Sequence, residues 1–200
     1  MYEFKVITLG DTFVGKTAIF RRYVYNIFDT NTEVTIGMNI SIKEITLKNN
    51  KKIKIRLVDT AGTEKYKSLS KQYFKNTDVV LFVFALNNLD SFENILNWMN
   101  LFENCNNRIN FIKYLIGNKN DLKQIVKQNQ INEFLNNKNF FGYKSVSAKN
   151  DDDNSINELF QEIGEELYKN YEKYGKNEKK NIKLSTYKEE KSGGCRSYFI

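Results

Sequence analysis

The feature that most constrains this chain is a glycine-rich loop between a strand signal and a helix signal near its start. Residues 5–9 have the character of a strand, and a helical pattern runs from Lys16 to about Tyr25. The eight residues at 10–17 fit the pattern G-x-x-x-x-G-K-[ST], in which backbone N–H groups and the lysine surround phosphate oxygens. The sequence therefore predicts a nucleoside triphosphate site made of Gly10, Asp11, Thr12, Phe13, Val14, Gly15, Lys16 and Thr17.

Two residues of this loop carry separate expectations. The hydroxyl of Thr17 is expected to bind Mg²⁺, as the last residue of this pattern does. Phe13 is a bulky residue in a loop that must approach phosphates, so its side chain is expected to point away from them. The loop alone leaves ATPases, kinases and GTPases open.

Composition narrows the chemistry further. The chain has no histidine, no proline and two cysteines, Cys105 and Cys195. These counts exclude a Ser-His-Asp triad, a His-ligated zinc or haem, and a zinc site made of thiolates alone. Any reaction must therefore use carboxylates, hydroxyls, lysines, backbone amides or a bound metal ion.

The positive charge is concentrated at the end of the chain. The formal net charge is +7, and residues 169–200 hold nine Lys or Arg against four Asp or Glu. Apolar periodicity stops after about Lys173, so we expect a folded domain over 1–172 and a flexible basic tail over 173–200. Because the folded part is nearly neutral and has no aromatic-basic module, we expect no nucleic-acid partner.

Strand and helix signals alternate along the rest of the folded part. Residues 79–85 form a continuous apolar run, as expected for a parallel strand buried on both faces. Strands alternating with helices indicate a parallel α/β sheet with helices on both sides. The further strand signals are at 53–57, 111–116 and 143–146, and the helix signals at about 91–104, 128–137 and 153–172.

A D-x-x-G run follows the strand that ends at Val58. A carboxylate at Asp59 can hold a water bound to Mg²⁺, and the N–H of Gly62 can contact a γ-phosphate because no side chain obstructs it. D-x-x-G by itself is common, but its place one strand after the phosphate loop makes it specific.

Two short runs at the ends of later strands identify the base. The carboxylate of Asp121 can accept two hydrogen bonds from guanine N1 and N2, and adenine has no such pair of donors. A charged group left unpaired by the wrong base makes this discrimination steep. Ser147-Ala148-Lys149 then offers a backbone N–H to the guanine oxygen. The sequence therefore predicts a guanine nucleotide.

These segments together resemble the five signature motifs of Ras-superfamily small GTPases, and the resemblance covers about residues 3–170. Within the superfamily the chain looks most like the Rab branch, on 36–40, 65–69, 72–76, 91–94 and Trp98. The motifs are G-D-T-F-V-G-K-T (10–17), T-I-G (35–37), D-T-A-G (59–62), N-K-N-D (118–121, with Asn118, Lys119 and Asp121) and S-A-K (147–149).

The resemblance implies a P-loop NTPase three-layer sandwich. Its six-stranded sheet is mostly parallel, with one antiparallel strand at about 38–47, and it carries five helices. It also implies that Thr35 completes the Mg²⁺ shell, that Phe28 packs over the guanine ring, and that Lys16 and Gly62 serve GTP hydrolysis. Loss of the γ-phosphate would release Thr35 and Gly62 and so switch the protein. Partners would be an exchange factor, a GTPase-activating protein and effectors that bind 35–45 and 61–76.

One departure from the family bears on catalysis. Thr63 stands where the family has the glutamine that orients the attacking water, and a threonine hydroxyl is too short to reach it. Because phosphoryl transfer depends on positioning, we expect very slow hydrolysis by the protein alone. Two interpretations follow: a switch whose activator supplies the missing groups, or a GTP-bound scaffold that recruits effectors without turnover.

The C-terminal tail raises the question of membrane attachment. Gly193-Gly194-Cys195 resembles a Rab prenylation tail, but Cys195 is sixth from the end and a C-a-a-X box needs a cysteine in fourth place. Lipidation at Cys195, with the basic tail as a second signal, and an unmodified cysteine are both open. No signal peptide or membrane-spanning run is recognisable. The expectation is a monomeric cytoplasmic protein, peripheral on the cytoplasmic face of an endomembrane, that regulates vesicle transport.

Overall fold

The structure is a computed structural model of the 200-residue chain. It describes residues 1–30, 34–35, 37–61, 73–106, 108, 110–151 and 154–185, with side chains described up to Lys173. In chain order the elements are β1 (Tyr2–Leu9), α1 (Lys16–Tyr25), β2 (Met38–Thr46), β3 (Lys52–Thr60), β4 (Val79–Ala85), α3 (Leu89–Glu93), α4 (Ile95–Glu103), β5 (Ile112–Asn118), α5 (Gln128–Lys138), β6 (Gly142–Ser145) and α6 (Ser155–Ser185).

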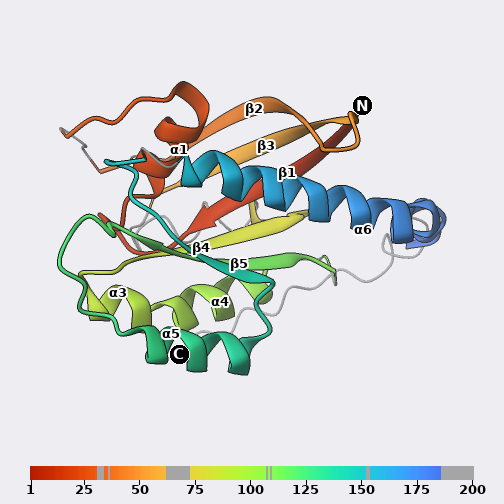
Figure 1. The fold of residues 1–200 in the computed structure, drawn as a ribbon. Helices are drawn as coiled ribbons and strands as arrows, with labels where there is room; N and C mark the ends of the chain where they lie inside the picture. Colours follow the sequence, from red (N-terminus) through yellow and green to blue (C-terminus); the bar gives the residue numbers. More distant parts are fainter. Residues whose placement is uncertain are drawn as a thin grey trace.

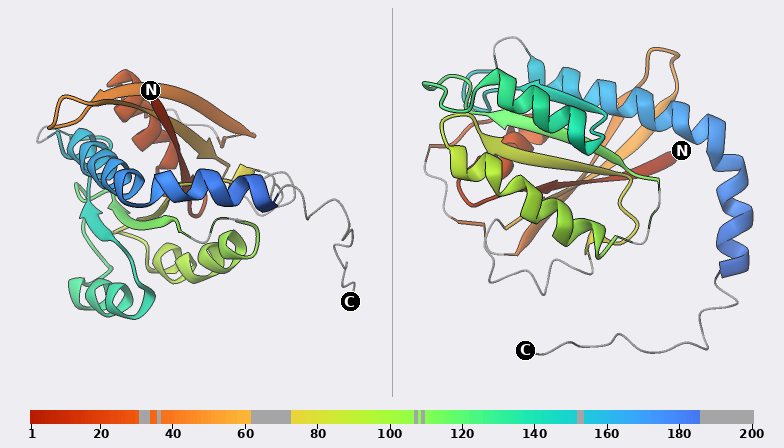
Figure 2. Two further views of the ribbon diagram at one scale, coloured as in Figure 1. Left: turned by 90° about the vertical axis from the view of Figure 1, so that its right-hand side faces the viewer. Right: turned by 90° about the horizontal axis from the view of Figure 1, so that it is seen from below.

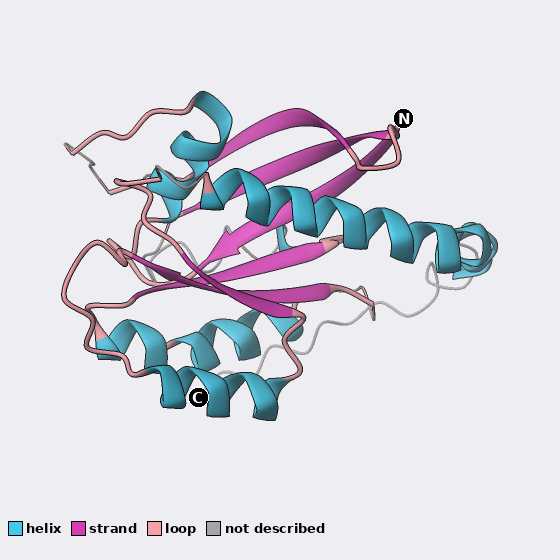
Figure 3. Ribbon diagram, in the orientation of Figure 1, coloured by secondary structure: helices cyan, strands magenta, loops and turns pink. Residues whose placement is uncertain are grey.

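Six strands form one sheet in the order β2-β3-β1-β4-β5-β6. β2 pairs with β3 in antiparallel register, with Met38 opposite Thr60, and the other four pairings are parallel. The predicted mixed sheet and its single antiparallel strand are therefore confirmed. The central strands β1, β3, β4 and β5 run in the same direction, so their carboxyl ends lie at one edge of the sheet (Figure 3).

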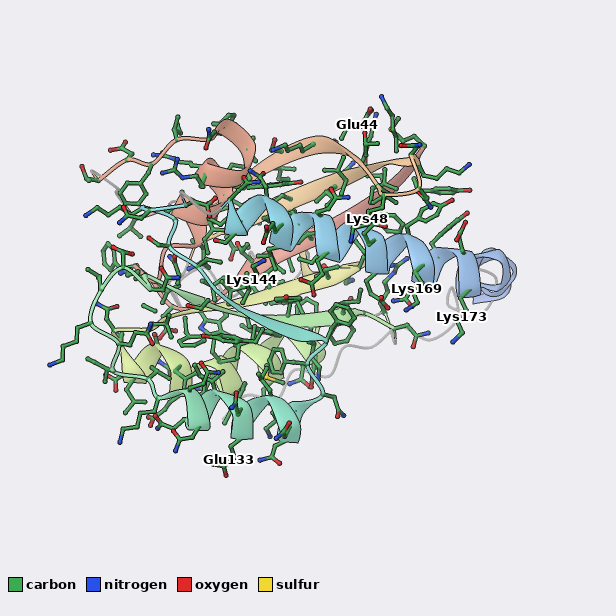
Figure 4. All side chains as sticks on the ribbon, in the orientation of Figure 1. Glu44, Lys48, Glu133, Lys144, Lys169 and Lys173 are labelled. Carbon is green, nitrogen blue, oxygen red and sulfur yellow. The ribbon has the colours of Figure 1, made fainter. Side chains whose placement is uncertain are left out.

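The helices cover both faces of the sheet and make it the middle of three layers. α1 and α6 lie on one face, and α3, α4 and α5 lie on the other (Figure 1). β4 is apolar throughout because both of its faces are buried. Leu81 and Val83 pack in the core on the side of α1 and α6, and Phe82 and Phe84 pack in the core on the side of α3, α4 and α5. Charged side chains such as Glu44 on β2, Glu133 on α5 and Lys169 on α6 are exposed on the surface of the molecule (Figure 4).

Two helices differ from the sequence expectation. The single helix predicted at 91–104 is divided into α3 and α4 at Asn94. The last helix, predicted to end near residue 172, runs to Ser185 and passes beyond the edge of the sheet (Figure 2). Residues 173–185 lack an apolar stripe but include five lysines, which favour helix without packing, and no proline interrupts them. The helix therefore includes residues 173–185 of the segment predicted as a tail, and the division into a domain over 1–172 and a tail over 173–200 stays a prediction.

The described residues include no helix with both the length and the apolar character that a membrane span needs.

Candidate nucleotide-binding site

The glycine-rich loop joins β1 to α1 at the carboxyl edge of the sheet, as the sequence predicts. Gly15 precedes α1 with a φ of 98°, and Gly10 has a φ of 148°. A Cβ atom at Gly10 would collide with the carbonyl oxygen of Val83, and one at Gly15 with the side-chain amide of Asn118. Glycine is required at both positions because the loop passes close to β4 and to the end of β5.

Lys16 lies at the base of this loop with only 5% of its surface exposed. Its Nζ donates to the carbonyl oxygens of Gly10 at 2.9 Å and Asp11 at 2.7 Å. Burial lowers the pKa of Lys16 to about 8, against the opposing effects of the Asp59 and Asp11 carboxylates. The ammonium group is thus held inside the loop, where a phosphate would stabilise its charged form.

Three oxygen-bearing side chains from separate elements meet beside the loop. The hydroxyls of Thr17 and Thr35 are 2.7 Å apart, and the Thr17 hydroxyl donates to the carboxylate of Asp59 at 2.8 Å. Asp59 is fully buried, and its pKa is raised mainly by desolvation. Two hydroxyls and one buried carboxylate fit Mg²⁺, which takes oxygen ligands and would offset the desolvation of Asp59.

Asn39 contributes to this cluster and was not predicted. It lies directly opposite Asp59 in the β2–β3 pairing, and its Nδ2 donates to the Asp59 carboxylate at 3.2 Å. An antiparallel pairing of the strand expected at about 38–47 with β3 brings its first residues near the end of β3, where Asp59 lies. No motif singles it out.

A cavity of about 160 Å³ opens beside the phosphate loop and the side chains of Thr17 and Thr35. Phe13 lies on its rim with a φ of 63° and 66% of its surface exposed. A bulky residue in this left-handed conformation is rare and carries a conformational cost. The cavity is lined by Thr12, Phe13, Gly15, Lys16, Thr17, Ala18, Val34, Thr35, Thr60 and Lys119.

Asn118, at the end of β5, connects three of the predicted motifs. Its Nδ2 donates to the carbonyl oxygen of Val14 at 2.8 Å, and its Oδ1 accepts the N–H of Ala148 at 3.1 Å. The hydroxyl of Ser147 donates to the Asp121 carboxylate at 2.6 Å. These bonds hold the N-K-N-D and S-A-K loops against each other and against the phosphate loop.

Arg22 is a second residue that sequence reasoning missed. It lies on α1, and its guanidinium donates to the carbonyl oxygens of Ala148 and Lys149, each at 3.0 Å. The helix that follows the phosphate loop therefore also fixes the loop expected to contact the base. A separation of 126 residues between Arg22 and Ala148 leaves no local signal for this contact.

A second cavity, of about 240 Å³, lies between these loops and Phe28. Lys119 lines both this cavity and the one at the phosphate loop, so the two adjoin through one side chain. The arrangement suits a ligand with a planar ring at one end and phosphates at the other. The second cavity is lined by Phe28, Thr30, Asn118, Lys119, Asp121, Leu122, Ala148 and Lys149.

Some predicted positions lie outside the described residues. These are Gly62, Thr63 and Cys195, together with Ile36 and most of the predicted effector segment 61–76. Among the described residues, the structure brings the predicted phosphate, magnesium and guanine positions together, and Thr63 is not one of the residues that it describes.

A strand–loop–helix phosphate site on a mixed α/β sheet defines the class of P-loop nucleotide-binding domains. The family model described as "Ras family" matches residues 5–169. The chain belongs to the Ras family.

Curated relatives are similar over most of the chain. The Ras-related protein Rab-11B of Dictyostelium discoideum is 34% identical, covering 84% of this chain and 77% of its own length. The GTP-binding protein YPT52 of Saccharomyces cerevisiae is 31% identical, covering 84% and 83%. The GTP-binding protein ypt3 of Schizosaccharomyces pombe is 31% identical, covering 84% and 77%. These relatives support the Rab-like resemblance that the sequence motifs predicted.

Proposed function

We propose that this protein is a guanine-nucleotide switch that binds GTP or GDP with Mg²⁺ and hydrolyses GTP slowly. One observation carries the proposal: Asn118 bonds to both the phosphate loop and the S-A-K loop, and the neighbouring Lys119 lines both the cavity at the phosphate loop and the cavity beside Phe28. A site with this shape and with Asp121 at one end fits a guanine nucleotide better than any other nucleoside triphosphate.

In this proposal the protein's own groups position the substrate. Lys16 and the loop amides bind the β- and γ-phosphates, and Thr17, Thr35 and Asp59 hold the metal, Asp59 through water. When bound, Mg²⁺ neutralises charge on the phosphates. Asp121 accepts hydrogen bonds from guanine, and Phe28 covers the ring. Gly62 senses the γ-phosphate. Loss of the γ-phosphate upon hydrolysis therefore relaxes the loops around Thr35 and Gly62.

Thr63 makes a second function a serious alternative. Without a carboxamide to orient water, the protein alone hydrolyses GTP more slowly than the roughly 10⁻⁴ s⁻¹ of a Ras-type enzyme with its glutamine. If an activating protein supplies the missing groups, the chain cycles as a switch. If none does, it persists as a GTP-bound scaffold that recruits effectors.

One measurement distinguishes these two functions, and a second tests the effect of Thr63 on the rate of hydrolysis. Nucleotide extracted from the purified protein is expected to be GDP for a switch and GTP for a scaffold. Single-turnover hydrolysis of [γ-³²P]GTP is expected to fall below about 10⁻⁴ s⁻¹ and to rise in a Thr63→Gln variant. Purified protein that binds neither guanine nucleotide would contradict the proposal as a whole.

The cellular role follows from the Rab and Ypt relatives. We propose a monomer that regulates vesicle transport from the cytoplasmic face of an endomembrane, with an exchange factor, an activating protein and effectors as partners. Attachment would use a lipid on Cys195 together with the basic C-terminal residues. Detergent partitioning after expression in a prenylating cell tests this, since a Cys195→Ser variant should leave the detergent phase and equal partitioning would exclude lipidation.

A further inference from the structure

Asp11 places a negative charge inside a loop that serves to bind polyanions. A carboxylate close to phosphates raises the free energy of the complex by Coulomb repulsion, unless the carboxylate is turned away or bonded to donors. None of the predicted site functions uses this side chain. The question is what the fold does with it.

Both oxygens of the Asp11 carboxylate accept hydrogen bonds from side chains of the α3–α4 segment. Oδ1 accepts the indole N–H of Trp98 at 2.8 Å, and Oδ2 accepts the amide Nδ2 of Asn94 at 2.9 Å. Trp98 is 7% exposed, so the donor side of its hydrogen bond is largely buried, while Asp11 is half-buried. Hydrogen bonds to a charged group are stronger than those between neutral groups.

The predicted helix is divided at Asn94, one of the two residues that donate to Asp11. Asn94 ends α3 and precedes α4, and Trp98 lies four residues later, so both donors stand on one side of the helix one turn apart. Asn94 also caps the turn, since its carbonyl oxygen accepts the N–H of Trp98 at 3.2 Å. Asn94 and Trp98 thus each donate to a different oxygen of the same carboxylate.

Asp11 is oriented at its main chain as well. Its carbonyl oxygen accepts from the Lys16 ammonium, which is the phosphate-binding group of the loop. Thr12, Phe13 and Lys16 line the phosphate cavity, whereas Asp11 is not among the described residues that line it. The main chain of Asp11 therefore faces the site while its charge faces the helices.

We propose that Asn94 and Trp98 are positioning residues for phosphate binding, which act by holding the Asp11 carboxylate out of the phosphate cavity. This inference rests on the proposed nucleotide function. Loss of either donor frees one carboxylate oxygen, allows the charge to turn toward the phosphates and accelerates release of the nucleotide. The effect runs through the charge of Asp11 and therefore requires that charge.

The test is a double-mutant cycle on the rate of mantGDP release. Release is followed by the fluorescence of the directly excited mant group, in excess Mg²⁺ and unlabelled GDP. Trp98→Phe and Asn94→Ala are each expected to accelerate release about tenfold, the equivalent of one hydrogen bond to a charged group. In an Asp11→Ala background, Trp98→Phe is expected to have no effect on release. The packing change from Trp to Phe is identical in both backgrounds, so the difference reports the carboxylate alone.

Charge and salt separate this mechanism from loss of packing. Asp11→Asn added to Trp98→Phe should restore slow release, because the amide keeps the shape and removes the charge. The acceleration by Trp98→Phe should shrink at 1 M salt, where the Debye length is about 3 Å. Asn100→Ala, at an exposed asparagine of the same helix, is the matched control and should release mantGDP like the unmodified protein.

The two proposals fail in different ways. If the unmodified protein retains no mantGDP, the nucleotide function itself is wrong. If it retains mantGDP but Trp98→Phe accelerates release equally with and without Asp11, the positioning role is wrong. Persistence of the acceleration in the Asp11→Asn, Trp98→Phe double variant would overturn it too.

Discussion

The two ends of the candidate site are built differently. At the base end the polar side chains are bonded to other protein groups: Asn118 joins Val14 to Ala148, and Ser147 bonds to Asp121. At the proposed magnesium end, the hydroxyls of Thr17 and Thr35 contact each other, and that of Thr17 donates to the carboxylate of Asp59. The base end is therefore set by the protein alone, whereas the magnesium end collects oxygen atoms that a cation would complete.

Burial sharpens this contrast. Asp59 is fully buried, and desolvation raises its pKa although Thr17, Asn39 and Lys16 oppose that shift. Asp121 is exposed and keeps its carboxylate open to a ligand. Without a cation the magnesium end carries an electrostatic cost that the base end does not. Changes at the base end should therefore alter which nucleotide binds, and changes at the magnesium end how long it stays.

The largest expected effect is a change of base preference in Asp121→Asn. A carboxylate accepts from both N1 and N2 of guanine, while an asparagine amide has one acceptor and one donor and suits the N1–H and O2 of xanthine. We expect the preference for GDP over XDP to fall about ten-thousandfold, as for a site built to hydrogen-bond a base. Competition of each nucleotide against mantGDP measures this ratio, and an unchanged ratio would remove Asp121 from base recognition.

The next largest effect is expected where the two ends touch, at Gly15. In Gly15→Ala the new Cβ meets the Asn118 amide, and the φ of 98° adds strain of about 1–2 kcal/mol. Displacing Asn118 also breaks its bonds to Val14 and Ala148, at about 1 kcal/mol each, so the affinity for GDP should fall by about several hundredfold. Isothermal titration of nucleotide-free protein measures it.

Gly37→Ala is the matched control for Gly15→Ala. Gly37 has a φ of 81°, but no atom of the described residues lies within 4 Å of its added Cβ, so it carries backbone strain without a collision among them. We expect about a tenfold loss of affinity or less from this variant. Equal losses in the two variants would mean that strain alone matters and that the contact between Gly15 and Asn118 does not join the two ends.

Removal of Mg²⁺ should act on one end only. In excess EDTA we expect GDP release to accelerate about a hundredfold, because the buried Asp59 carboxylate then faces the phosphates without a neutralising cation. The ratio of GDP to XDP affinity should not change. Release that ignores EDTA would show that Thr17, Thr35 and Asp59 do not hold a metal.

The sequence predicted the sheet and the loops at its edge because those signals are local. The apolar run at 79–85 indicates a strand buried on both faces, and the phosphate loop, D-T-A-G, N-K-N-D and S-A-K each lie at the carboxyl end of a strand. Parallel topology then brings those loops to one edge. The end of α6 was missed for the opposite reason, because residues after 172 lack the apolar stripe on which the prediction relied.

The contacts that tie the site together were not predictable in this way. Arg22 reaches Ala148 across 126 positions, and Trp98 reaches Asp11 across 87. Each of these side chains could equally pack or point to solvent as far as local sequence is concerned. Their roles depend on which elements the fold places side by side, and only the three-dimensional arrangement supplies that.

The smallest expected effect tests whether Asn39 supports the magnesium end. Its amide donates to Asp59 at 3.2 Å from the neighbouring strand and is partly open to water, so its loss should cost less than a buried bond to a charge. In Asn39→Ala we expect the Mg²⁺ concentration that half-protects GDP from release to rise about threefold, with no change in base preference. Ser41→Ala, on the same strand, is the control. If both variants shift the Mg²⁺ midpoint equally, the effect belongs to strand β2 as a whole, and the magnesium end extends no further than Thr17, Thr35 and Asp59.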